Sequence, residues 1–313
     1  MKRILIALAA LAFTASLASA QDMAMATDTF NQAATILNDE EGDKTEALKL
    51  FKEALSMGEL CGEEGEELVA NCKKVIPGLV LAIAKGQIND ADYDNAVATL
   101  KEAAAAAKDY EVEGIAEEVE ELIPNAYLRK GTTLMKAKDF EGAVEALKNV
   151  VAAKPEDGQT HLMIGQALMQ LGNNEGAVES LLKAAEFGKA DNANKLLSNI
   201  YLKQGMTLLK EGNNAGAIEA LEKVNAIAEN ANAYKLLASA YTKSGKTANA
   251  LDAYKNYLKL SPNAKDAAGV KLTIAATAQK AGDKATAIEY YKMLVGDAQY
   301  GATAKQQLEV LQK

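Results

Sequence analysis

Residues 125 to 187 read NAYLRKGTTLMKAKDFEGAVEALKNVVAAKPEDGQTHLMIGQALMQLGNNEGAVESLLKAAEF, and this stretch states one pattern twice. Six residues return after 34 positions: Tyr127, Gly131, Leu134, Ala143, Val144 and Leu147 recur as His161, Gly165, Leu168, Ala177, Val178 and Leu181. A fixed period of this size indicates a solenoid of repeated units. Apolar residues fall at helical spacing on both sides of the polar break at 137–139, so each unit is predicted to be a helix hairpin.

The second helix of each hairpin opens with an alanine that a branched or leucyl residue follows. This pair recurs along the chain at Ala47, Ala96, Ala143, Ala177, Ala217, Ala250 and Ala287. The pattern resembles the tetratricopeptide repeat family, with residues 233–262 as its most typical unit. The resemblance implies an all-α, right-handed superhelical solenoid of about seven antiparallel helix hairpins, and a role in binding other proteins. Gly131 and Ala143 are expected where two such helices approach closely.

Spacing between the alanines suggests how the chain is organised. Ala96 follows Ala47 by 49 residues and Ala143 follows Ala96 by 47, whereas later intervals run from 33 to 40. Pro77 and Pro124 each close a glutamate-rich insert, where proline is expected to end or kink a helix. We therefore expect divergent hairpins with cysteine-containing and glutamate-rich inserts over residues 21–123. A regular array with a C-terminal capping helix is expected over residues 124–313.

The chain begins with the pattern of an export signal. Lys2 and Arg3 precede an apolar run over residues 4–17, and residues 18–20, Ala-Ser-Ala, are typical of a signal-peptidase site. Residues 1–20 are predicted to be a cleaved signal peptide, with the protein in the periplasm or secreted from a Gram-negative-like cell. No later stretch reaches 18 apolar residues, so no integral membrane segment is expected after cleavage.

Charge and motif content narrow the function. The 34 basic and 43 acidic residues give a net charge of −9, which becomes −11 without Lys2 and Arg3 and disfavours nucleic acid as a partner. His161, the one histidine, occupies the aromatic position of its repeat and is interpreted as a packing residue. No nucleophile, dinucleotide, phosphate-loop or zinc motif is found, so neither enzymatic activity nor a cofactor is predicted.

Two acidic clusters and two cysteines offer further candidates. Residues 63–67 and 117–121 are rich in glutamate, but a solvated helix face is favoured over a metal site because calcium also needs loop carbonyls. Cys61 and Cys72 are the two cysteines of the chain, and an even number of cysteines in an exported protein favours a disulfide. The bridge requires a hairpin between them, and glycines at 58, 62 and 65 permit one. Two ordinary unbridged thiols are the alternative.

In the family that the chain resembles, the first helix of each hairpin lines a concave groove for peptides or partner helices. The matching positions make up the candidate groove: Leu128, Thr132, Lys136, Leu162, Gln166, Gln170, Leu202, Met206, Lys210, Lys235, Ser239, Lys243 and Lys280. Leucine at most of the positions that need lysine disfavours the clamp that some members use for a C-terminal carboxylate. Such a groove has an apolar floor and a basic edge, which suits a protein or peptide with apolar and acidic residues. The alternative is that the leucines pack internally and the lysines complement helix dipoles.

We therefore predict a non-catalytic protein-interaction scaffold of the cell envelope that binds a peptide or helix in this groove. A structural accessory subunit of an envelope or secretion complex, using its outer surfaces, is the first alternative. An enzyme with an unrecognised site is the second. The sequence assigns no oligomeric state.

Overall fold

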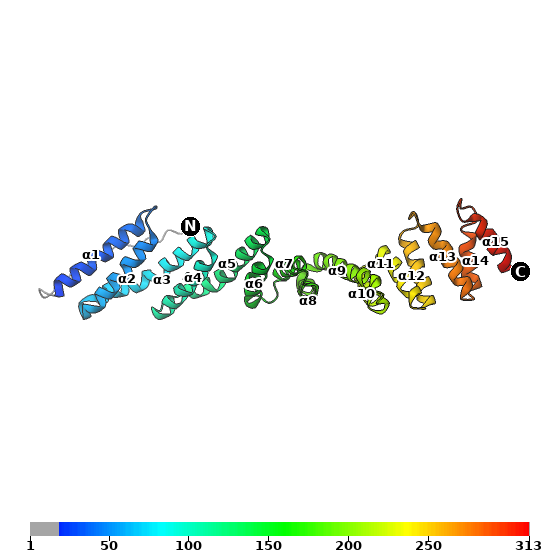
Figure 1. Cartoon of the computed structure of the whole chain (residues 1–313). Coiled ribbons are helices and arrows are strands. Elements are labelled where there is room, and N and C mark those ends of the chain that lie inside the picture. The colour runs from blue at the N-terminus through cyan, green and yellow to red at the C-terminus, as the bar shows by residue number, and fades with distance from the viewer. Residues whose placement is uncertain (1–18, 313) are drawn as a thin grey trace. The chain divides into compact units, whose positions relative to one another are not determined.

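Antiparallel helices follow one another through residues 19–312, the part of the chain that the computed structural model describes (Figure 1). The predicted all-α tetratricopeptide-like solenoid is confirmed. The predicted signal peptide occupies residues 1–20, and residues 1–18 lie outside the described part. None of the described helices combines the length and the apolar character that a membrane span requires.

The chain divides into two units, and the first, Met1–Thr160, holds three helix hairpins. Each hairpin pairs a first helix with the second helix that follows it along the chain. The described elements are α1 (Ser19–Asn38), α2 (Lys44–Leu60), the 3-10 turn η1 (Gly62–Gly65), α3 (Glu66–Asn89), α4 (Tyr93–Asp109), α5 (Ile115–Ala137) and α6 (Phe140–Ala153). The domain boundary expected between residues 123 and 124 lies within α5.

The second unit, His161–Lys313, holds four hairpins and a final single helix. Its elements are α7 (Gly158–Gln170), α8 (Asn174–Ala184), the π-turn η2 (Ala185–Lys189), α9 (Ala190–Lys210), α10 (Asn214–Ile227), α11 (Ala231–Lys243), α12 (Thr247–Leu260), α13 (Ala267–Lys280), α14 (Lys284–Lys292) and α15 (Gly301–Gln312). Residues 19–312 thus contain the seven hairpins that the sequence predicted.

Small residues close the hairpins where the sequence placed them. A Cβ atom added to Gly131 would lie 2.7 Å from the Leu147 side chain, and one added to Gly165 would lie 2.7 Å from the Leu181 side chain. Ala143 and Ala177 are fully buried. The two helices of each hairpin therefore touch along a line where no larger side chain fits.

The turns inside the later hairpins share one capping arrangement. Asp139, Asn173, Asn213 and Asp283 each accept a hydrogen bond of 3.0 Å from the backbone N–H three residues further on. This bond satisfies an otherwise unpaired donor in the first turn of the second helix. The preceding Gly172 and Gly212 adopt φ of 75° and 79°, a left-handed conformation that glycine takes without strain.

Pro77 and Pro124 are expected to end or kink their helices, and the expectation that the helices end there is wrong. α3 and α5 continue through both prolines, over 24 and 23 residues. Proline inside a helix costs about 3 kcal/mol, since it removes a backbone hydrogen bond. Both rings are buried, and Ile76 is 1% exposed, so packing in this unit outweighs that local cost. The inserts therefore lengthen first helices instead of forming separate elements.

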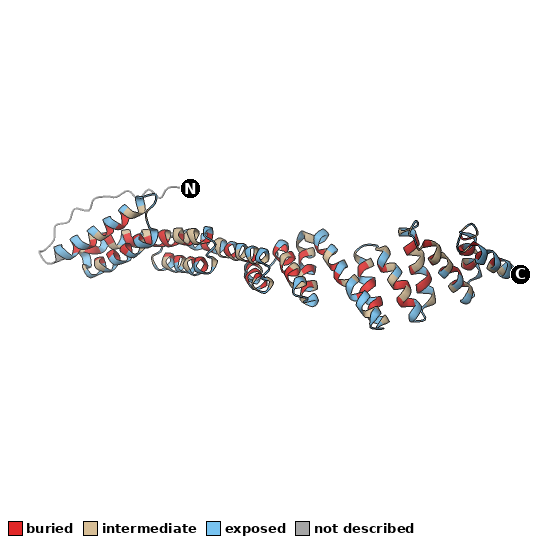
Figure 2. Cartoon of the chain, turned by 45° about the horizontal axis from the view of Figure 1, so that its top comes forward, coloured by how far each residue is buried: buried red, intermediate tan, exposed pale blue. Residues whose placement is uncertain are grey.

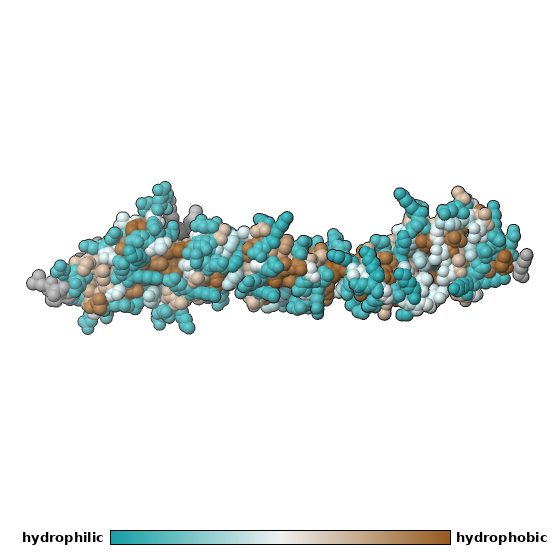
Figure 3. All heavy atoms as spheres, viewed as in Figure 1, coloured by the Kyte–Doolittle hydropathy of each residue, from teal (hydrophilic) through white to brown (hydrophobic). Residues whose placement is uncertain are grey.

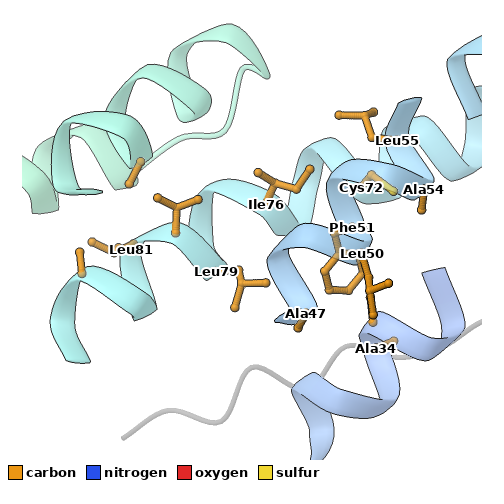
Figure 4. Packing of buried hydrophobic residues seen from close by; sticks show 14 of the residues in the cluster. Ala34, Ala47, Leu50, Phe51, Ala54, Leu55, Cys72, Ile76, Leu79 and Leu81 are labelled. Carbon is orange, nitrogen blue, oxygen red and sulfur yellow. The ribbon is translucent and has the colours of Figure 1, made fainter. Parts of the chain in front are cut away.

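Buried residues lie on the helix sides that face neighbouring helices (Figure 2). The first unit has a large apolar cluster in which Phe51 and Cys72 lie among aliphatic side chains (Figure 4), with the rings of Phe30 and Phe51 in edge-to-face contact at 5.2 Å. The second unit has three smaller clusters, one for each neighbourhood of hairpins. This distribution is typical of repeats whose hairpins pack mainly on their neighbours.

Candidate protein-binding surfaces

All of the predicted groove residues lie on first helices. Leu128, Thr132 and Lys136 are on α5 of the first unit. The remaining ones are on first helices of the second unit: Leu162, Gln166 and Gln170 on α7, Leu202, Met206 and Lys210 on α9, Lys235, Ser239 and Lys243 on α11, and Lys280 on α13. The second unit therefore carries most of the candidate groove.

The apolar floor is thinner than predicted. Leu162 is only 3% exposed and packs in a core cluster with Ala177 and Leu181, so it belongs to the interior. Leu202 is half-buried, whereas Met206 is 41% exposed. The view in Figure 3 likewise shows hydrophobic residues as patches set among hydrophilic side chains. Among the apolar residues of the candidate groove in the second unit, Met206 is the most exposed and therefore the one available to a partner.

Lys235 is tied to its neighbours by a polar cluster. Its Nζ atom lies 2.5 Å from Asp266 Oδ2 and 5.6 Å from the centre of the Tyr257 ring, and the Tyr257 hydroxyl donates to Asp266 Oδ1 at 2.5 Å. The hydrogen bond from Lys235 lowers the pKa of Asp266, and the same bond raises the pKa of Lys235. Part of the Lys235 charge is therefore already compensated inside the protein.

The other predicted lysines are available to solvent. Lys136, Lys210, Lys243 and Lys280 stand in the last turns of their helices and are exposed. None of these four forms an ion pair with any residue in the described range 19–312. Their positive charges interact favourably with the negative end of each helix dipole. Their ammonium groups remain available to an external anion.

Charge in the second unit is sorted by helix, a feature that the sequence analysis missed. First helices α7, α9, α11 and α13 carry seven lysines and one carboxylate, Asp191. Second helices α8, α10, α12 and α14 carry six lysines and six carboxylates. Counting charges helix by helix would have revealed this contrast, which whole-chain composition hides.

Helical spacing gathers six of these lysines on one side of the first helices. Lys195, Lys203 and Lys210 on α9 lie within one arc with Leu202 and Met206, because the steps from 195 to 202 or 203, on to 206 and then to 210 are three, four, seven or eight residues long. Four-residue steps likewise link Lys235, Ser239 and Lys243 on α11. We call this set the basic face, comprising Lys195, Lys203, Lys210, Lys235, Lys243 and Lys280.

The first unit contains a separate small depression of ≈ 240 Å³ between two first helices. Its lining combines two cations, two amides and two aliphatic side chains: Lys85, Ile88 and Asn89 from α3, and Leu122, Asn125 and Arg129 from α5. Lys85 Nζ lies 2.6 Å from Glu118 Oε1, so one of the two cations in the lining is already paired. The sequence analysis did not select these residues, because none of them stands in the groove rows of the repeat.

Comparison with known proteins agrees with this architecture. The sequence model described as tetratricopeptide repeat matches residues 128–194, 202–265 and 236–302, which together make up more than half of the chain. The chain belongs to the tetratricopeptide repeat (TPR) family. TPR arrays indicate a protein–protein interaction scaffold. No curated protein sequence matches the chain.

Several solved TPR-type structures are similar to this chain. The MamA protein of Desulfovibrio magneticus is 21% identical over 61% of this chain and 97% of its own, with a TM-score of 0.31. The type IV pilus biogenesis factor PilW is 19% identical over 76% and 99%, with a TM-score of 0.29. The TPR2AB domain of yeast Sti1, in its complex with pHSP90, is 14% identical over 94% and 96%, with a TM-score of 0.35. These values transfer no function to this chain.

The two cysteines of this TPR chain lie on either side of the hairpin that the sequence required. Cys61 caps the end of α2, and Cys72 is fully buried in α3 after the turn η1. Both are free thiols in the structure. Burial raises the pKa of Cys72 to about 12, which keeps its thiol protonated and poorly reactive at neutral pH. The bridge stays a prediction, and thiol labelling of unfolded, unreduced protein would distinguish the two states.

His161 packs inside the TPR fold, whereas glutamates of both acidic clusters lie on its surface. His161 is 6% exposed, and its ring centre lies 5.7 Å from that of Phe187, as a packing residue would be placed. Glu63, Glu117 and Glu121 are exposed to solvent. Within residues 19–312 no group of three or more histidine, cysteine, aspartate or glutamate side chains is arranged to hold a metal ion.

Proposed function

We propose that this TPR chain is a non-catalytic scaffold of the cell envelope whose basic face binds a peptide or helix with acidic and apolar residues. One observation carries the proposal, namely that the first helices of the second unit hold seven lysines against one carboxylate in a chain of net charge −9. The second helices of the same unit hold equal numbers of lysines and carboxylates, so the excess of cations is confined to the first helices.

The physical effect of this face is mainly steering and selection. Complementary charge speeds encounter with an acidic segment and disfavours a basic one, whereas each exposed pair adds only about 0–1 kcal/mol of affinity. Met206, with its long and flexible side chain, adds an apolar contact that tolerates different partner side chains. The face therefore suits a partner helix or extended segment with carboxylates beside aliphatic residues.

Location in the envelope rests on the sequence pattern of residues 1–20. Intact-mass analysis of protein recovered from the envelope is expected to show a chain that begins at Gln21. A mass that includes residues 1–20 would contradict export by cleavage and would leave the binding proposal untouched.

Charge reversal tests the basic face directly. The variant K203E/K210E/K243E changes three exposed lysines, and it is expected to lower capture of partners from envelope extract by about tenfold or more. The matched control K259E/K284E/K292E makes the same charge change on the second helices α12 and α14, and capture should stay near wild type. Equal capture by both variants would refute the basic face and would favour the accessory-subunit alternative, in which outer surfaces bind.

A further inference from the structure

Residues 109–121, DYEVEGIAEEVEE, are the most acidic exposed segment of the first unit. They hold seven carboxylates and no cation. All seven carboxylate residues are exposed, and only Glu118 forms an ion pair, with Lys85. We call this stretch the acidic segment.

The acidic segment also contains apolar side chains and has a defined helix–turn–helix backbone. It ends α4, turns at Gly114 with φ of 82°, and then forms the first two turns of α5. Tyr110, Val112 and Ile115 are half-buried, so apolar surface lies beside the carboxylates. Favourable interaction with the helix dipole accounts for Glu117 and Glu118 in the first turn of α5. It does not account for Glu111, Glu113 or Glu121.

The two units of the chain also carry opposite net charge. Residues 21–160 contain 14 basic and 29 acidic side chains, whereas residues 161–313 contain 18 basic and 14 acidic ones. Two first units repel each other, as do two second units, but a first unit and a second unit attract. Contact between copies is therefore favoured in the head-to-tail sense.

From this complementarity we propose that the basic face of one copy binds the acidic segment of a second copy. The basic face brings six lysines, of which Lys235 is already paired, and the segment brings seven carboxylates, of which Glu118 is already paired. Leu202 and Met206 meet the apolar side chains of the segment. The proposal rests on the basic face described under the proposed function and names its occupant. Because the two contacting surfaces differ, the association is heterologous. After two copies have bound, one basic face and one acidic segment are still unoccupied and can bind further copies.

Heterologous association gives a chain or a closed ring and depends strongly on salt. Exposed charges more than about 10 Å apart are screened at ~0.1 M salt. Sedimentation velocity of the purified protein is therefore expected to show concentration-dependent growth beyond the dimer at ~50 mM salt, and monomers at ~500 mM salt.

Two charge-reversal variants provide the decisive test. E113K/E120K/E121K leaves four carboxylates and three lysines in the acidic segment, and K203E/K210E/K243E leaves three lysines and three glutamates on the basic face, so each variant removes most of the net charge of one surface. Each variant alone is expected to remain monomeric, because one of its two surfaces has lost nearly all of the net charge that attracts the other. An equimolar mixture has one complementary contact left and is expected to stop at a one-to-one dimer. In the chain with all six substitutions neither surface keeps a strong net charge, and this chain is expected to stay monomeric at ~50 mM salt.

Matched controls separate this contact from general charge effects. E53K/E145K/E156K and K259E/K284E/K292E change the same net charge at exposed positions away from both surfaces, and both should associate as wild type does. Wild-type protein that stays monomeric at ~50 mM salt, or a mixture that fails to dimerise, would overturn self-association. If K203E/K210E/K243E still lost envelope capture in that case, the basic face would remain and its occupant would be an acidic segment of another protein.

Discussion

The two units of this protein use the same hairpin but join successive hairpins by different polar contacts. In Met1–Thr160 the contacts between helices include the ion pairs Lys52–Glu102 at 2.8 Å and Lys130–Asp94 at 2.5 Å. In His161–Lys313 the ion pair Lys235–Asp266 at 2.5 Å is accompanied by hydrogen bonds from tyrosine hydroxyls. The bonds from Tyr241 to Glu222 and from Tyr257 to Asp266 link successive hairpins, and the bond from Tyr291 to Gln279 links α14 to α13 within one hairpin.

Exposure decides what these contacts contribute. The side chains of the first unit's pair Lys52 and Glu102 are 49% and 50% exposed, and such pairs contribute about 0–1 kcal/mol. Tyr241 and Tyr291 are 8% and 2% exposed, where a hydrogen bond contributes about 0.5–3 kcal/mol, depending on the charge of its acceptor. The exposed ion pairs of the first unit therefore add little stability, whereas buried hydroxyl groups add stability to the apolar packing of the second unit.

The largest expected effect comes from overpacking a hairpin of the second unit. Ala177→Leu places a larger side chain at the fully buried contact between α7 and α8, and we expect a loss of ~1–3 kcal/mol or more. Hydrogen exchange should rise from α7 to α10 and stay near its original level in α13 and α14, because hairpins depend mainly on their neighbours. Ala215→Leu, at an exposed position of α10, is the control. Uniform loss of protection across α7 to α14 would contradict independent hairpins.

A smaller effect is expected when the buried hydroxyl groups are removed. Tyr241→Phe and Tyr291→Phe keep the ring and delete the bonds to Glu222 and Gln279, so each should cost about 1 kcal/mol. Denaturant unfolding followed by hydrogen exchange should place both losses in the second unit. Tyr93→Phe is the comparison in the first unit, since its hydroxyl has only a long contact of 3.4 Å with Thr133. An equal loss for all three variants would remove the distinction between the units.

Alkaline pH tests the same distinction without mutation. Burial, with a hydrogen bond to Glu222, raises the pKa of Tyr241 to about 12 from its ordinary value of 10.0. Since the folded state favours the protonated hydroxyl, this stabilisation is fully present below pH 10.0 and is lost as pH rises through about 12. Exchange in α10 and α11 should therefore rise over this range, and Tyr241→Phe should weaken the rise. A variant with an unchanged alkaline transition would show that Tyr241 is not its cause.

The smallest effect is expected at the ion pairs of the first unit. A double-mutant cycle on Lys52→Ala and Glu102→Ala should give a coupling of about 0.2–1 kcal/mol, and added salt should reduce it. A salt-independent coupling well above that range would mean that the first unit is also held by strong polar contacts.

Local pattern in the sequence was sufficient to predict the hairpins. The small residues Gly131 and Gly165 and the anchor Ala143 identify the close contacts, because sterics at these points leave few other residues possible. The uninterrupted course of α3 and α5 could not be predicted in this way. Proline has an unfavourable local effect, and only the packing around Pro77 and Pro124 outweighs it.

The binding surface was predicted less well, because exposure depends on contacts between repeats. Leu162 stands in the same row as Leu202 but is buried, and Lys235 stands in that row too but pairs with Asp266 from another hairpin. Neither fact follows from a position within one repeat. The sorting of charge onto first helices was present in the sequence, yet it becomes visible only when helix boundaries are known.

The uninterrupted α3 also sets the breadth of the surface that each hairpin presents. At 1.5 Å per residue, its 24 residues extend ~36 Å, whereas the 13 residues of α11 extend ~20 Å. A repeat protein usually enlarges its contact area lengthwise by adding hairpins. Here the inserts that carry Pro77 and Pro124 enlarge it crosswise, by about three helical turns per first helix. A ligand that lies parallel to α3 can therefore contact this single helix over ~36 Å, whereas a ligand parallel to α11 can contact it over only ~20 Å.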